Sequence, residues 1–85
     1  MGDFNFNKRQ CLRAFKKLGF YEGGKRRGNH DKYFPPKEIA EKLPADQAHF
    51  IMIPRHNELH IQHEIIKELE AMGGIELVEN FRKYL

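Results

Sequence analysis

The chain has 85 residues, of which 40% are hydrophobic and 12% aromatic, and its formal net charge is +3. A chain of this length can bury one apolar core, so we expect a single domain over residues 1–85, and the composition argues against disorder. No run of about 18 apolar residues occurs, and the first residues do not resemble a signal peptide, so we expect a cytoplasmic protein without membrane contact.

Positive charge is concentrated in the first part of the chain. Residues 1–37 hold ten Lys and Arg against three Asp and Glu, a balance of +7, whereas residues 38–85 hold five against nine, a balance of −4. Contacts to phosphate come mainly from clustered cations. The division therefore favours one surface that faces a polyanion.

The most clearly predicted element is a helix from Asn7, a good helix cap, to about Leu18, with Gly19 as its stop. Its apolar face carries Cys11, Leu12, Phe15 and Leu18. Cys11 is the only cysteine, which excludes an internal disulfide, and these neighbours indicate a core position. The outer face is either a solvated surface or part of a phosphate-binding surface; it carries Lys8, Arg9, Arg13, Lys16 and Lys17.

A hairpin is predicted next, with strands over residues 20–25 and 30–34 and a turn region from Arg26 to Asn29 that contains Gly28. Pro35 and Pro36 end the second strand, and a helical turn is expected within residues 38–43. The apolar run from Phe50 to Ile53, which ends at Pro54, predicts a third strand.

Apolar residues recur at helical spacing after residue 60. The apolar residues of this second main helix are Ile61, Ile65, Ile66, Leu69 and Met72, and Gly73 and Gly74 provide the stop. A short terminal helix follows, and its apolar face should pack on the core or, less expectedly, meet a partner; it holds Leu77, Val78, Phe81 and Tyr84. The expected fold is a two-layer α+β domain of order α-β-β-β-α with an extra C-terminal helix and one open sheet face.

The segment from Lys25 to His30 combines three cations, a glycine, an amide and an imidazole at a turn. This set suits RNA cleavage, because RNA supplies its own nucleophile, the 2′-hydroxyl, and an imidazole takes up and releases protons near neutral pH. The neighbouring cations and Lys32 would neutralise charge on the phosphate, while Asn29 would donate a hydrogen bond. A basic turn with a surface histidine is, however, also common in proteins that cleave nothing.

Several stretches occur in an order that resembles the HicA toxin family. These are Lys17-Leu18-Gly19-Phe20, Arg27-Gly28-Asn29-His30, Ile53-Pro54-Arg55-His56, Glu58-Leu59 and Met72-Gly73-Gly74-Ile75. The similarity spans residues 7–75, so residues 76–85 form a C-terminal helical extension. The resemblance implies a fold similar to double-stranded RNA-binding domains and an mRNA interferase of a type II toxin-antitoxin system, with RNA as substrate and a HicB-like antitoxin as protein partner.

The family's Gly-Ser-His signature falls on Gly28, Asn29 and His30, which makes His30 the expected catalytic residue of a metal-independent endoribonuclease without a cofactor. Asp31 stands where a second histidine is common; its carboxylate would either disturb the site or lie on the opposite strand face. The expected RNA-binding residues are Lys25, Arg26, Arg27, Gly28, Asn29, Lys32, Arg55 and His56.

Two other functions remain open on the sequence alone: a nucleic-acid-binding module that does not cut, and a protein-interaction domain that uses the acidic second half and the apolar terminal helix. Metal binding by His56, His60 and His63 is not expected, because Lys67 stands where a His-Glu-x-x-His motif would place its second ligand.

Overall fold

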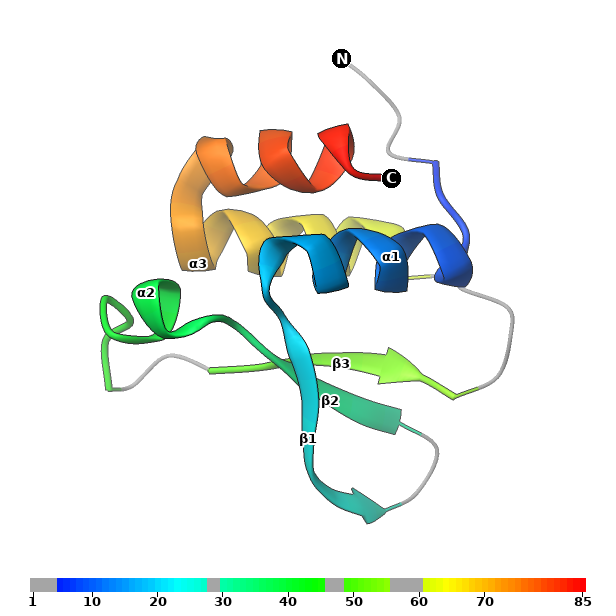
Figure 1. Ribbon diagram of the computed structural model, residues 1–85, viewed down its shortest axis with the longest axis horizontal. Coiled ribbons are helices and arrows are strands. Elements are labelled where there is room, and N and C mark those ends of the chain that lie inside the picture. Colours follow the sequence, from blue (N-terminus) through cyan, green and yellow to red (C-terminus); the bar gives the residue numbers. More distant parts are fainter. Residues whose placement is uncertain (1–4, 28–29, 46–48, 56–60) are drawn as a thin grey trace.

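The computed structural model describes residues 5–27, 30–45, 49–55 and 61–85. The described elements are α1 (Lys8–Leu18), β1 (Tyr21–Arg27), β2 (His30–Phe34), α2 (Lys37–Ala40), β3 (Ile51–Pro54) and α3 (Gln62–Lys83). The strands form an antiparallel sheet of order β1-β2-β3, and α1 and α3 lie on the same side of it (Figure 1). The predicted α+β fold is confirmed. In the described part of the chain, no helix has the length and apolar character needed to cross a membrane.

Helix α1 begins and ends where the sequence predicts. The Asn7 side chain accepts a hydrogen bond from the Gln10 backbone N–H at 2.8 Å, and the Gln10 side chain accepts one from the Asn7 N–H at 3.0 Å. This reciprocal capping box satisfies two N–H groups that the helix itself leaves unpaired. At the other end Gly19 adopts a φ of 92°, a left-handed conformation that glycine tolerates without strain.

The hairpin extends farther than predicted, because Arg26 and Arg27 belong to β1 and not to the turn. The Cα of Arg27 pairs with that of His30, so the ladder continues to the last residues before the connection. The register shifts between Gly23 and Arg27: residues 24–26 stand opposite the single residue Asp31. Such an irregularity bends and twists a strand, and here it lies directly beside the start of β2.

Helix α3 contains the break that its two glycines predict. Gly74 has φ 71° and ψ −167°, a conformation outside the helical region, so the helix divides into two parts that fold back on each other (Figure 1). Ile65, Leu69 and Met72 are buried in the first part, and Leu77, Val78 and Phe81 in the second. The terminal helix therefore covers the core, which was the favoured expectation for it.

Phe15 lies at the centre of the core. Its ring stacks on Phe20 with centroids 4.9 Å apart and contacts Phe81 and Tyr33, each at 5.6 Å. Phe6, which precedes α1, meets Phe81 edge to face at 5.2 Å. One group of rings thus joins the chain start, α1, β2 and the terminal helix.

Truncation of Phe81 tests whether the terminal helix is part of this core. We expect Phe81→Ala to lower the free energy of unfolding by about 3–5 kcal/mol, because it removes a fully buried ring and two ring contacts. Urea unfolding followed by circular dichroism measures the change, with the exposed Glu79→Ala as control. A decrease in the free energy of unfolding of less than about 1 kcal/mol would show that the terminal helix contributes little to the core.

Candidate nucleic-acid interface

Strand β2 divides its side chains between two faces of the sheet. Tyr33 packs on Phe15 of α1, so it faces the helices, and the same face carries Ile51 and Ile53 of β3, which are fully buried. Because successive strand residues point to opposite sides, His30, Lys32 and Phe34 share the other face. Met52 of β3 pairs with Lys32 and is 44% exposed, which confirms that this second face is open.

His30 is the first residue of β2, and its side chain is exposed. Its Cα pairs with Arg27 on one side and with Pro54 on the other, so the imidazole stands on the middle strand of the sheet. Two residues farther along the same face, the Lys32 ammonium lies 4.8 Å from the centroid of the Phe50 ring. The structure therefore places a titratable ring and a cation along one strand of the open face.

Apart from Arg55, the other residues of the predicted RNA-binding set either belong to β1 or lie outside the described residues. Lys25, Arg26 and Arg27 form the end of β1, the strand that pairs with the start of β2. Gly28, Asn29 and His56 lie outside the described residues. The Cα of Arg27 pairs with that of His30, and Lys25 and Arg26 precede it in the irregular stretch of β1.

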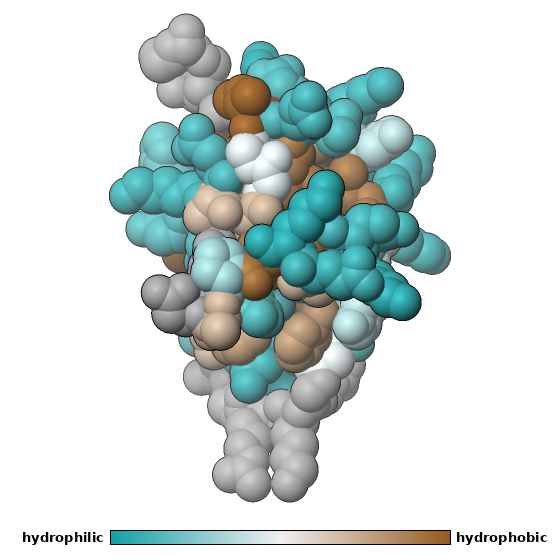
Figure 2. Space-filling model, turned by 90° about the vertical axis from the view of Figure 1, so that its left-hand side faces the viewer, coloured by the Kyte–Doolittle hydropathy of each residue, from teal (hydrophilic) through white to brown (hydrophobic). Residues whose placement is uncertain are grey.

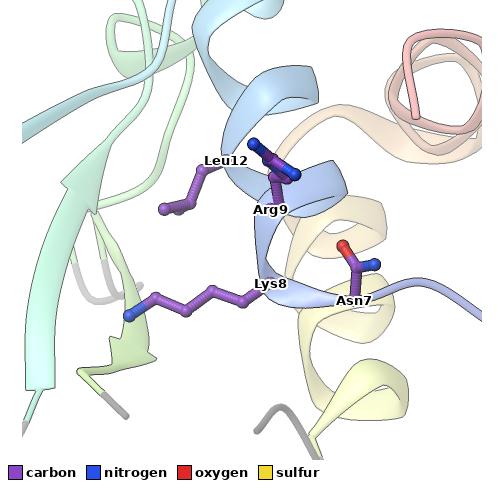
Figure 3. A pocket seen from close by; sticks show the side chains of 4 residues that line it. All are labelled: Asn7, Lys8, Arg9 and Leu12. Atoms are coloured by element: carbon purple, nitrogen blue, oxygen red, sulfur yellow. The ribbon is translucent and has the colours of Figure 1, made fainter. Parts of the chain in front are cut away.

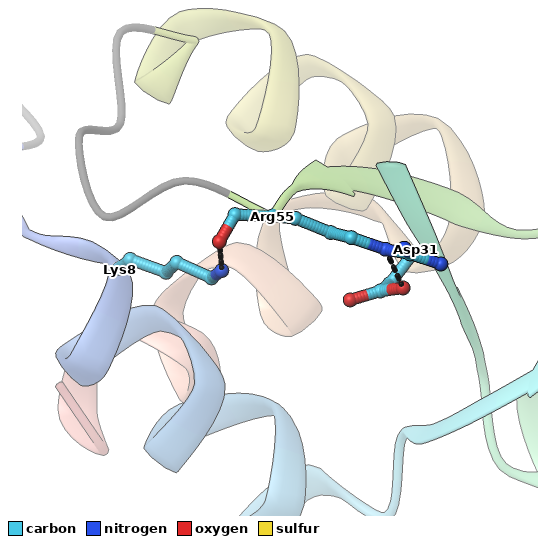
Figure 4. Close-up of polar contacts among 3 residues, drawn as sticks. All are labelled: Lys8, Asp31 and Arg55. Atoms are coloured by element: carbon cyan, nitrogen blue, oxygen red, sulfur yellow. Dashed lines mark hydrogen bonds and ion pairs between the residues drawn. The ribbon is translucent and has the colours of Figure 1, made fainter. Parts of the chain in front are cut away.

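Arg55 does not join His30 on the open face. Its Nε lies 3.0 Å from Oδ1 of Asp31, whose Cα pairs with the buried Ile53, so this ion pair lies on the helix side of the sheet (Figure 4). Of the two placements that the sequence left open for Asp31, the structure shows the one directed away from His30. The Asp31 carboxylate therefore partners Arg55 and does not oppose a phosphate at the open face.

The sequence did not predict that Lys8 joins this group. Its ammonium donates a hydrogen bond of 2.7 Å to the backbone oxygen of Arg55 (Figure 4). The side chain extends from the start of α1 toward the strands and lines a hollow with Asn7, Arg9 and Leu12 (Figure 3). Sequence periodicity shows only which residues share a helix face. It could not predict this contact between Lys8 of α1 and Arg55, the residue after β3.

The remaining cations of α1 lie in the layer of helices. Arg9, Arg13, Lys16 and Lys17 are exposed, and the Lys17 ammonium lies 5.8 Å from the ring centroid of Tyr84. The sheet separates them from the open face that carries His30. They form a solvated helix surface and are not a continuation of the site around β2.

Aromatic side chains make up the part of the open face that the sequence analysis missed. Tyr21 pairs with Phe34 across β1 and β2, and Phe34 in turn contacts Phe50 before β3. The available signal was the alternation of cation and aromatic ring at Lys32 and Phe34. Figure 2, which shows the side of the molecule at the left of Figure 1, also has hydrophobic residues at the surface among hydrophilic ones.

Cys11 and His63, the histidine of α3, give no second site among the described residues. Burial raises the pKa of the Cys11 thiol to about 12, so the thiol stays protonated at neutral pH. His63 is exposed in the first turn of α3, whereas His56 and His60 lie outside the described residues. Within the residues that the structure describes, no three His, Cys, Asp or Glu side chains converge on a metal-binding position.

Comparisons with models of protein families, with curated proteins and with solved structures found no match to this chain.

The burial of Cys11 predicts an inert thiol in the folded protein. A pKa raised from 9.0 to about 12 lowers the thiolate fraction at pH 8 roughly 1,000-fold. We therefore expect labelling by a thiol reagent at pH 8 to be at least about 1,000-fold slower in buffer than in 8 M urea, where the chain is unfolded. Labelling followed by mass spectrometry measures both rates, and equal rates would contradict the core position of Cys11.

The ion pair between Asp31 and Arg55 is partly shielded, with side-chain exposures of 14% and 39%. A double-mutant cycle with Asp31→Asn and Arg55→Gln should give a coupling of about 0.5–1 kcal/mol in low salt, and about 1 M NaCl should reduce it. The wider, exposed pair of Lys37 and Glu41, at 3.9 Å, is the matched control and should show no measurable coupling. Equal coupling in the two pairs would mean that shielding by the fold contributes nothing.

Proposed function

We propose that the chain is an RNA-binding endoribonuclease that uses His30, as expected for the toxin of a type II toxin-antitoxin pair with a HicB-like antitoxin as its partner. One observation carries this proposal: His30 is exposed on the open face of the sheet, with Lys32 on the same strand face and the cationic end of β1 beside it. The resemblance of residues 7–75 to HicA toxins agrees with this arrangement.

The chemistry follows from what RNA itself supplies. Neutral His30 accepts the proton of a 2′-hydroxyl, and the 2′-oxygen then forms a bond to the adjacent phosphorus. The bond between phosphorus and the 5′-oxygen breaks, and the imidazolium formed in the first step returns its proton to that leaving oxygen. The products are a 2′,3′-cyclic phosphate and a 5′-hydroxyl. This route needs no metal ion, since both the nucleophile and the leaving group belong to the substrate.

Charge on the reacting phosphate is stabilised by the cations around β2. Lys32 is directed to the face of His30, the position of Arg27 pairs with His30 across the β1–β2 ladder, and Lys25 and Arg26 precede Arg27 in the same strand. Asp31 lies on the other side and is neutralised by Arg55 at 3.0 Å. The open face thus keeps a positive potential, which attracts a phosphate backbone and stabilises a phosphorane-like transition state.

A nucleic-acid-binding module that does not cut is the second candidate, and one observation favours it. Tyr33, the tyrosine of the same strand and a candidate for the second proton-transfer group beside His30, packs on Phe15 in the helix layer, so His30 would have to act alone. In that case the same open face would hold RNA through cations and rings without cleaving it.

Substitution of His30 separates the two candidates. We expect the purified chain to cut a long single-stranded RNA in EDTA and His30→Ala to cut it at least about 100-fold more slowly, because general acid-base catalysis is lost. His63→Ala is the matched control, since it removes an exposed histidine from α3. Cleavage by His30→Ala at the parent rate would refute the catalytic role. Intact RNA with a salt-sensitive gel shift of the parent would favour the binding module.

A further inference from the structure

Three aromatic rings form a row across the open face of the sheet. The Tyr21 and Phe34 rings are stacked with centroids 5.8 Å apart and an interplanar angle of 21°, and the Phe34 and Phe50 centroids are 5.6 Å apart. Gly23 leaves room for this row, because a Cβ at that position would lie only 3.2 Å from Cδ1 of Phe34. The rings of β1, β2 and the segment before β3 are therefore packed against one another at the surface.

This aromatic row, Tyr21-Phe34-Phe50, does not belong to the core. The core lies on the other side of the sheet around Phe15, and Ile51 and Ile53 of β3 are directed there. Tyr21 is 57% exposed, and Met52 beside the row is 44% exposed. Apolar surface gathered in one place, and not scattered singly, indicates a binding surface.

We propose that the aromatic row is a stacking platform for unpaired nucleobases, which positions an RNA strand with its phosphates along Lys32 and toward His30. This inference rests on the proposed function and adds the part of the RNA that the site recognises. Stacking on aromatic side chains is how proteins hold single-stranded nucleic acid without reading its sequence, because every base has a flat apolar face. In a duplex these faces are covered by neighbouring base pairs.

The arrangement of charges favours RNA over an apolar protein segment as the occupant. Lys32 lies 4.8 Å from the centroid of Phe50, so a cation stands directly beside the rings. His30, Lys32 and Phe34 alternate along one strand face and span about 13 Å, given a rise of about 3.3 Å per residue. A nucleic-acid strand likewise offers phosphates along one side and flat bases along the other, whereas a purely apolar segment would leave Lys32 without a counter-charge.

The experiment measures binding apart from cleavage. In the His30→Ala background, fluorescence anisotropy compares a uridine 12-mer with an abasic 12-mer of the same backbone. Tyr21→Ala should weaken binding of the uridine 12-mer roughly 5- to 100-fold and leave the abasic 12-mer unchanged, because only the first offers bases to stack. Tyr21→Phe should restore the affinity. Ile75→Ala, which removes another exposed apolar side chain (62%) from the helix layer, is the matched control and should change neither affinity.

The outcomes separate this proposal from the proposed function. If Tyr21→Ala binds the uridine 12-mer as the His30→Ala parent does, the row does not stack bases and its exposure points to a protein partner, whatever the cleavage assay shows. Equal weakening for both 12-mers would also overturn the platform, since the effect would not depend on bases. Binding of neither 12-mer by the parent would overturn the platform and RNA binding together. If Tyr21→Ala weakens only base-dependent binding and the parent cleaves no RNA, the platform is supported and the nuclease activity of the proposed function is contradicted.

Discussion

The contact between Tyr33 of β2 and Phe15 of α1 is the constraint on which the rest of the molecule depends. It fixes which face of the middle strand is directed to the helices, and Ile51 and Ile53 of the neighbouring strand bury the same face. Because side chains alternate along a strand, a shift of one residue would exchange the two faces. Burial of one apolar face therefore determines that His30, Lys32 and Phe34 are directed to the other, and so creates the open surface.

The same alternation separates opposite charges along a short segment. Asp31 and Lys32 are adjacent in sequence, yet one carboxylate is held by Arg55 at the helix side while the ammonium lies beside the Phe50 ring on the open side. A neutralised pair on one face and a cation that contacts an aromatic ring on the other give the sheet an electrostatic asymmetry. The apparent conflict of an acidic residue next to His30 thus disappears once the pleat of the strand is considered.

The sequence predicted those features that depend on local patterns. Asn7, Gly19 and the glycine pair before Ile75 set helix ends through backbone geometry, and the apolar spacing of α3 showed its buried face. Features that join distant segments were missed: the bond from Lys8 to the Arg55 oxygen spans 47 residues, and the aromatic row combines three segments. The hairpin was predicted too short, because propensity favoured a turn at Arg26 whereas ladder pairing with β2 continues to Arg27. Nothing in a single sequence gives such pairings.

The two faces of the sheet have different roles, which explains how such a small domain keeps one face open. The core lies on one side, where the Phe81 ring of the terminal helix contacts Phe6 and Phe15, and Phe15 contacts Tyr33 of the sheet. The break at Gly74 lets the last helix return over the core, so that this layer is completed without using the other face. The open face therefore need not contribute to the core. Phe15 affects that face indirectly, because its contact with Tyr33 belongs to the register that places His30 on the open side.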